Sequence, residues 1–153
     1  MAIVEATKLA YFAGIIDGEG TITLERHSPT SLKHPSPTFS ASLYVSNTNM
    51  DVLKALQDTF CGSIAKHKQN SVSQKEIYRW RLYGTKAISV IGLVSPYLII
   101  KRKQAEIVLA YQIRPKEKLT GKVRRLTIDE LNYRESVVNR IRELNRRGVT
   151  SLA

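Results

Sequence analysis

Two acids stand among glycines near the start of the chain, where the stretch AGIIDGEG runs from Ala13 to Gly20. The apolar residues before Asp17 predict a helix that ends at these acids, and a helix C-terminus carries unpaired carbonyls and a partial negative charge. The Glu19 carboxylate and the Gly18 carbonyl can turn toward one point there, because glycine tolerates the required backbone angles. Mg²⁺ favours sites with one or two protein oxygens, several waters and substrate phosphates. The pattern indicates a metal site, with a plain acidic turn as the alternative.

The same helix carries a run of small residues. Ala10, Ala13, Gly14 and Asp17 follow the spacing i, i+3, i+4, i+7, which predicts that they share one face. Gly14 costs about 1 kcal/mol in a helix interior relative to Ala, so we expect a packing reason for it. The face should approach another helix closely, either within the chain or in a second copy across a twofold axis.

The charge of the chain points to a polyanionic partner. The formal net charge is +11 over 153 residues, and residues 101–153 contribute +8 of it. Such an excess is typical of proteins that bind nucleic acid, and less often of those that bind acidic membranes. In the basic linker that follows Pro115, we expect five residues to contact phosphates: Lys116, Lys118, Lys122, Arg124 and Arg125.

Other features of the sequence bear on where the protein works. Cys61 is the one cysteine, which excludes a disulfide within the chain and favours a reducing compartment. The first residues do not resemble a secretory signal, and no apolar run is long enough to span a membrane. We therefore expect a soluble intracellular protein, in the cytoplasm or in an organelle.

The elements that must position the acids follow from the hydrophobic periodicity. We expect helices at 7–17, capped by Thr7, and from Asn49 or Asp51 to about 60, then at 85–94, 97–113 and 127–147, the last capped by Thr127. Strands are expected at 21–27 and 38–47, and a hairpin is expected from strands at 63–69 and 76–84. This αββαββα order predicts an α+β fold with a four-stranded antiparallel sheet, helices on one face and extra C-terminal helices. We expect one domain over 1–153, with a core at about 7–113 and a linker and helix at about 114–147.

The stretch FAGIIDGEG, from Phe12 to Gly20, resembles the LAGLIDADG motif of homing endonucleases, with Phe12 for Leu and Glu19 for the second Asp. The resemblance extends to about Ile113. It implies a site-specific endonuclease that hydrolyses double-stranded DNA with Mg²⁺ or Mn²⁺ at a long, roughly palindromic site. Because the motif occurs once here, it also implies a homodimer in which two motif helices pack at the axis.

The resemblance also implies roles for individual residues. Glu19 would bind metal near the scissile phosphate, with Gly18 adding a carbonyl, whereas Asp17 would be structural and hydrogen bonded at the helix end. Lys101 matches a lysine near the active site, although Arg102 and Lys103 are close competitors.

One further residue has two interpretations. Asn47 ends the second expected strand, where the family often has Gln or another polar residue. There it would position the attacking water, or else serve as a turn residue before the next helix.

The solvent face of the sheet should read DNA, because its side chains mix basic and hydrogen-bonding groups. The expected readers are Thr23, Glu25, His27, Ser40, Ser42, Tyr44, Lys66, Lys68, Arg79 and Arg81. The strand from Ser63 is ambiguous, because a one-residue slip would exchange Lys66 for His67 on this face.

In an alternative interpretation, the protein shares the fold but has lost DNA cleavage or combines it with a second activity. Such a protein would be an RNA-splicing maturase with intron RNA as partner, or a DNA-binding regulator. Retention of both Glu19 and Lys101 favours the nuclease, since a pure binder needs neither.

Overall fold

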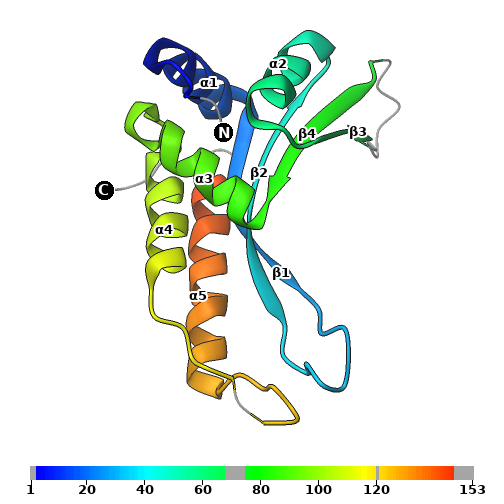
Figure 1. Cartoon of the computed structure of the whole chain (residues 1–153), viewed down its shortest axis with the longest axis vertical. Helices are drawn as coiled ribbons and strands as arrows, with labels where there is room; N and C mark the ends of the chain where they lie inside the picture. Colours follow the sequence, from blue (N-terminus) through cyan, green and yellow to red (C-terminus); the bar gives the residue numbers. More distant parts are fainter. Residues whose placement is uncertain (1–2, 68–74, 120, 147–153) are drawn as a thin grey trace.

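The computed structural model describes residues 3–67, 75–119 and 121–146. Its elements follow the expected order (Figure 1). They are α1 (Ala6–Glu19), β1 (Gly20–His27), β2 (Thr38–Asn47), α2 (Met50–Phe60), β3 (Ser63–His67), β4 (Ile77–Tyr83), α3 (Gly84–Val94), the 3₁₀ helix η1 (Ser95–Tyr97), α4 (Arg102–Ile113) and α5 (Ile128–Asn145). The expected α+β architecture is confirmed.

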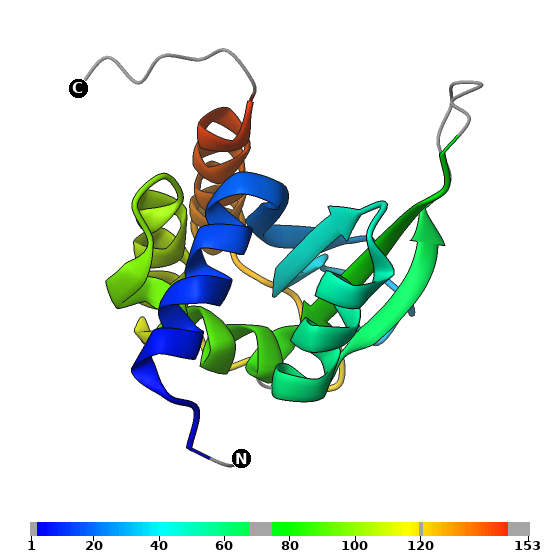
Figure 2. The ribbon, with the colours of Figure 1, turned by 90° about the horizontal axis from the view of Figure 1, so that it is seen from above.

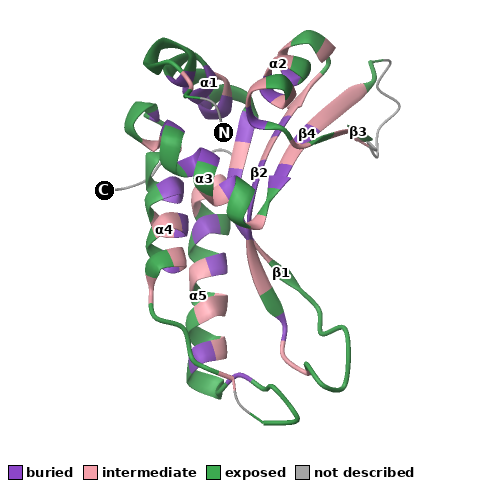
Figure 3. Cartoon of the chain, viewed as in Figure 1, coloured by how far each residue is buried: buried purple, intermediate pink, exposed green. Residues whose placement is uncertain are grey.

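The four strands form an antiparallel sheet in the order β1-β2-β4-β3. Leu43 of β2 lies opposite Ile22 of β1 and Leu82 of β4, so these three side chains share one face. That face is buried beneath α1, α2 and α3, and it forms the hydrophobic core with Trp80 (Figures 1 and 3). The other face, which alternates with it along each strand, is mostly half-buried or exposed and is free to contact a partner.

The last two helices lie beside the edge strand β1 rather than on the solvent face of the sheet (Figure 1). Val138 and Ile141 of α5 are fully buried, and the Asn145 side-chain amide donates to the Ile22 carbonyl of β1 at 3.0 Å. The described part of the C-terminal extension therefore protects the free edge of the sheet and supports the fold.

Local capping signals were informative at two helices and misleading at the first. The Asn49 side chain accepts from the Asp51 amide, which selects Asn49 over Asp51 as the cap, and the Thr127 hydroxyl accepts from the Glu130 amide, which confirms that cap. Thr7 does not cap α1, because the helix already begins at Ala6 and its N-terminus has no side-chain cap.

The end of α1 lies two residues later than expected, at Glu19, so Gly18 is part of the helix. Gly20 ends it, and its amide donates to the Ile16 carbonyl. A Cβ at Gly20 would lie 2.8 Å from that carbonyl oxygen, which only glycine avoids. The chain can thus pass directly from helix to strand.

The expected helix 97–113 is shorter in the structure. Ser95–Tyr97 forms a 3₁₀ turn, and α4 begins at Arg102 because the preceding backbone amides of Ile99 and Lys101 bond to Asp17 instead of forming a helix. The expected end of the last helix at Arg147 lies outside the described residues, and α5 is described to Asn145. Within the described residues, no helix combines the length and apolar character needed to cross a membrane.

Candidate active site and nucleic-acid interface

A cavity of about 620 Å³ lies at the C-terminal end of α1. Glu19 and Lys101, which are distant in the sequence, both line it. Its complete lining is Gly18, Glu19, Gly20, Thr21, Tyr44, Ser46, His67, Ile77, Arg79, Ile100, Lys101, Gln104, Leu144, Asn145 and Arg146. The cavity is therefore continuous with the solvent face of the sheet, to which Tyr44 and Arg79 belong.

The two acids of the motif have different surroundings. The buried Asp17 carboxylate accepts hydrogen bonds from the Ile99 amide at 2.7 Å and the Lys101 amide at 2.9 Å. Glu19 is exposed and lines the cavity. Asp17 thus ties the end of α1 to the segment before α4, whereas Glu19 is available to a ligand.

Lys101 contributes a cation to the same cavity. Its ammonium donates to the Asp17 backbone carbonyl. Burial lowers the pKa of Lys101, while the charges of Asp17 and Glu19 act in the opposite direction. Its two competitors do not line the cavity: Arg102 donates to the Leu98 carbonyl at 2.9 Å, and Lys103 is exposed on α4.

The donor set fits a hard divalent cation that is completed from outside the chain. Within the described residues, no three His, Cys, Asp or Glu side chains are grouped closely enough to hold a metal. One chain contributes the Glu19 carboxylate and the Gly18 carbonyl at a negative helix end, which suits Mg²⁺ with water and phosphate oxygens as the remaining ligands.

Asn47 lies apart from this group. Its side-chain oxygen accepts from the Asn49 amide at 2.8 Å, and Asn47 is not among the residues that line the cavity. The geometry is that of a turn residue before α2, the second of the two interpretations.

The small-residue face of α1 differs from the one the spacing indicated. Ala13 and Asp17 are buried within the chain and belong to its inner side. Ala10, Gly14 and Gly18 are exposed instead, and a methyl group added at either glycine would meet nothing within 4 Å. The accessible bare strip therefore follows the spacing i, i+4, i+8.

The solvent face of the sheet carries two arginines stacked on tyrosines. On this face of the sheet, the Arg79 guanidinium lies 4.2 Å from the centre of the Tyr44 ring, and the Arg81 guanidinium lies 4.9 Å from the centre of the same ring. Arg81 also lies over the Tyr83 ring and forms an ion pair with Glu25 at 3.2 Å. Stacking fixes the planar guanidinium groups, as recognition of a base edge requires.

Polar contacts on this face connect the expected readers to one another. The Arg79 side chain donates to the Ser46 hydroxyl at 2.9 Å, and His27 contacts the Ser40 hydroxyl at 2.9 Å. Thr23 is half-buried beside Ser42 on the neighbouring strand. Ser42 itself is fully buried and its hydroxyl has no hydrogen-bond partner, so the expectation that it reads DNA directly is wrong for this structure.

The register of β3 resolves the ambiguity in that strand. Ala65 pairs with Arg79 and Lys66 pairs with Tyr78, so Ala65 and His67 share the solvent face with the arginines. Lys66 lies on the opposite face and forms an ion pair with Glu76, which makes its assignment as a reader wrong. Lys68 lies outside the described residues.

The basic linker lies against the loop between β1 and β2. The Arg124 amide donates to the Lys33 carbonyl at 3.0 Å, and the Leu126 amide donates to the Ser36 hydroxyl at 2.8 Å. All of the expected phosphate-contacting residues are exposed: Lys116, Lys118, Lys122, Arg124 and Arg125. The Lys116 ammonium lies 5.2 Å from the Tyr111 ring centre, and its partial burial there lowers its pKa.

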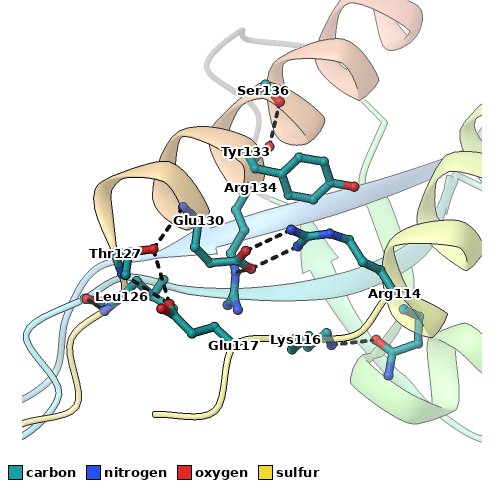
Figure 4. A network of polar contacts seen from close by, with 11 residues as sticks. Arg114, Lys116, Glu117, Leu126, Thr127, Glu130, Tyr133, Arg134 and Ser136 are labelled. Atoms are coloured by element: carbon teal, nitrogen blue, oxygen red, sulfur yellow. Dashed lines mark hydrogen bonds and ion pairs between the residues drawn. The ribbon is translucent and has the colours of Figure 1, made fainter.

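A network of charges holds the linker at its two ends (Figure 4). Both guanidinium nitrogens of Arg114 donate to the Glu130 carboxylate at 3.0 Å, and Arg134 donates to it at 2.7 Å. The hydrogen bonds from Arg114, aided by Arg134, lower the pKa of Glu130 despite its burial. The network thereby joins the end of α4 to the start of α5.

Comparison with solved structures places this architecture among the homing endonucleases. The chain has the fold of I-CvuI in complex with its target in the presence of Ca, with a TM-score of 0.67 and 21% identity over 94% of this chain and 86% of that one. I-Vdi141I, an archaeal intron-encoded homing endonuclease complexed with DNA, has a TM-score of 0.66 and 16% identity over 98% and 91% of the two chains. A mutant of I-SmaMI has a TM-score of 0.55 and 15% identity over 96% of this chain and 46% of that chain. No family model and no curated protein matches the sequence.

Several residues of the cavity were not among the sequence-based candidates, including His67, Gln104, Asn145 and Arg146. The register of β3 brings in His67, the packing of α5 against β1 brings in Asn145 and Arg146, and α4 contributes Gln104, which bonds to Asn145. None of these arrangements has a local sequence signal.

Proposed function

We propose that the protein is a site-specific endonuclease for double-stranded DNA. The observation that carries the proposal is the cavity in which Glu19 and Lys101 meet at the edge of a basic sheet face. The DNA complexes of I-CvuI and I-Vdi141I, which share the fold, support DNA as the partner. The splicing-maturase alternative gains no support from these neighbours, and we do not propose it.

Glu19 and Gly18 are the proposed metal ligands, with Mg²⁺ or Mn²⁺ as the ion. A bound divalent ion would activate water and stabilise the leaving oxygen of the phosphodiester. Lys101 would place its positive charge near the same phosphate and offset the charge that develops in the transition state. Asp17 holds Lys101 in position, because its carboxylate accepts from the Lys101 backbone amide and its backbone carbonyl accepts from the Lys101 ammonium.

A second copy of the chain would complete the enzyme. The exposed strip of Ala10, Gly14 and Gly18 permits close approach of two α1 helices, and the cavities at their ends would then lie near one axis. The chain spans 46% of I-SmaMI, whose length leaves room for two such units. A twofold assembly implies a target that is roughly palindromic.

The sheet would contact DNA bases, and the linker would contact DNA phosphates. Arg79 and Arg81, stacked on tyrosines, suit guanine edges in the major groove. The exposed cations Lys122, Arg124 and Arg125 suit phosphates, which fix the protein on the duplex without reading sequence.

Selection of cleaved sites from a random DNA library with Mg²⁺ tests the proposal. The expected result is a long, roughly palindromic consensus and no cleavage when EDTA replaces the metal. Light scattering of the protein on the selected duplex should give two protomers per site. Failure to cut any member of the library, or a monomer on the duplex, would contradict the proposal.

A further inference from the structure

The end of α5 forms a wall of the cavity that contains Glu19. Leu144, Asn145 and Arg146 line the cavity together with Glu19 and Lys101. Viewed from above, the C-terminal end of α1 and that of α5 lie side by side (Figure 2). The extension beyond the αββαββα core thus reaches the site at which we propose cleavage.

Three hydrogen bonds fix the two residues before Arg146. The Asn145 amide nitrogen donates to the Ile22 carbonyl of β1 at 3.0 Å. Gln104, which is only 4% exposed, donates to the Asn145 side-chain oxygen at 3.2 Å and to the Leu144 carbonyl at 3.3 Å. The end of α5 is therefore held by both α4 and the sheet, and the backbone of Arg146 has a defined place at the rim of the cavity.

The cavity holds negative groups together with three cations, Arg79, Lys101 and Arg146. Two helix C-termini, of α1 and α5, end at the same cavity, and each adds partial negative charge to that of Glu19. A DNA phosphate entering this cavity would be repelled unless cations offset these charges. Among the described residues, arginine ion pairs involve Arg26, Arg81, Arg114 and Arg134, and none involves Arg146.

We infer that Arg146 binds a DNA phosphate beside Glu19, and that Asn145 and Gln104 are positioning residues that hold it there. The inference rests on the proposed function and deepens it, because it assigns the C-terminal extension a part in substrate binding as well as in stability. The guanidinium, with its fixed fork of donors, suits a phosphate better than a point charge would.

The test compares Arg146→Ala with Arg142→Ala, a change at an exposed arginine one turn earlier on α5 that does not line the cavity. Binding to the selected duplex without metal is measured between about 50 and 200 mM salt, and cleavage is measured with Mg²⁺. Arg146→Ala should lower the slope of log K against log salt by about 1 and slow cleavage about a hundredfold. Arg142→Ala should change neither, and Arg146→Lys should retain the slope while recovering part of the rate.

The positioning role is tested by non-additivity. Asn145→Ala should reproduce the loss of salt slope, and the double change with Arg146→Ala should be no worse than Arg146→Ala alone. A merely structural Asn145 would instead add its own loss in thermal stability and leave the slope unchanged. Circular dichroism melts of each variant report on folding.

The outcomes separate the inference from the proposed function. If the parent protein cuts its selected site and Arg146→Ala matches it in slope and rate, the inference is overturned and the proposed function stands. If the parent cuts nothing, the proposed function fails, and the slope on a random-sequence duplex still decides whether Arg146 contacts phosphate.

Discussion

Two groups of charges in this molecule differ in how they are satisfied. Around Glu130, at the start of α5, one buried carboxylate receives hydrogen bonds from Arg114 and Arg134, so that its oxygens are satisfied within the chain. Around Glu19, at the end of α1, the carboxylate is exposed, and Lys101 of the same cavity donates to a backbone carbonyl. The first group is complete and the second is not.

The difference separates a group that stabilises the fold, around Glu130, from a group that is available for function, around Glu19. A closed group has its lone pairs and protons satisfied, and breaking it leaves a buried charge unpaired. An open group leaves its charges available, which disfavours the isolated fold but suits a metal and a phosphate. Changes in the closed group should therefore affect stability, and changes in the open group should affect activity.

The largest effect is expected at the open group. Glu19→Gln removes the proposed metal carboxylate at nearly constant volume, and loss of several kcal/mol of transition-state stabilisation should slow cleavage by roughly a thousandfold. Single-turnover cleavage of the selected duplex measures the rate. Glu5→Gln, at the exposed start of the same helix, is the control and should leave the rate unchanged. Cleavage by Glu19→Gln at the parental rate would refute the metal role.

Glu130→Gln should lower stability rather than activity, by about 3 kcal/mol, because two arginines lose a buried carboxylate partner. Urea unfolding monitored by circular dichroism measures the change. The control is Glu135→Gln, which removes the partly exposed ion pair with Arg26 and should cost under about 1 kcal/mol.

The pH dependence of stability is a second test of the Glu130 group. Because the pKa of Glu130 is lowered in the fold, its contribution is present above the ordinary glutamate pKa and is lost as the pH falls through the lowered value. Glu130→Gln should therefore flatten the acid side of the stability curve. An unchanged acid limb would contradict the closed-group interpretation.

A smaller effect concerns recognition. Arg81→Ala removes a stacked guanidinium from the reading face and should cost about 1–3 kcal/mol of discrimination at one base pair of each half-site. Repeating the site selection with the variant measures this as relaxed preference at that position. A consensus identical to the parental one would show that Arg81 only supports Tyr44 and Tyr83.

Lys101 offers a test through pH. Burial lowers its pKa, so its ammonium should lose its proton at a lower pH than an ordinary lysine. If the charged form stabilises the transition state, kcat/KM should fall on the alkaline side through this lowered pKa. Lys101→Arg, which keeps its charge, should extend the active range upward even if its maximal rate is lower. An unshifted alkaline limb would argue against Lys101 as the titrating group.

The smallest effect is expected at Lys66, which faces away from the arginines. Lys66→Ala should change the affinity for the selected duplex by less than about 0.5 kcal/mol, since its exposed pair with Glu76 contributes little. His67→Ala, its neighbour on the reading face, should weaken binding more. The opposite order in a gel-shift titration would mean that the register of β3 changes on DNA.

Local rules predicted much of the fold and part of the site. The cap at Thr127 and the alternation of β1 and β2 depend on nearest neighbours, so the sequence alone identified them, whereas it left Asn49 and Asp51 as alternative caps of α2. The strand from Ser63 has polar residues at both parities, and only its pairing with β4 decides which set faces outward. The small-residue spacing on α1 likewise fits more than one face, and the packing of Ala13 into the core selects among them.

The cavity was less predictable because it joins remote segments. Asp17 meets the amides before α4 and Asn145 meets β1, and such contacts depend on the whole chain being folded. Motif residues in helix α1 were visible in the sequence, but the residues that α5 adds to the cavity were not.

The pairing of β3 with β4 has a practical consequence for redesign. An effort to change the DNA target would vary codons on the reading face, and the register assigns Ala65, His67, Arg79 and Arg81 to it while excluding Lys66 and Tyr78. A library built on the wrong parity would place its diversity on the opposite face of the sheet, where Lys66 pairs with Glu76 and faces away from the arginines. The hydrogen-bond pattern of one five-residue strand thus decides which part of sequence space such an experiment explores.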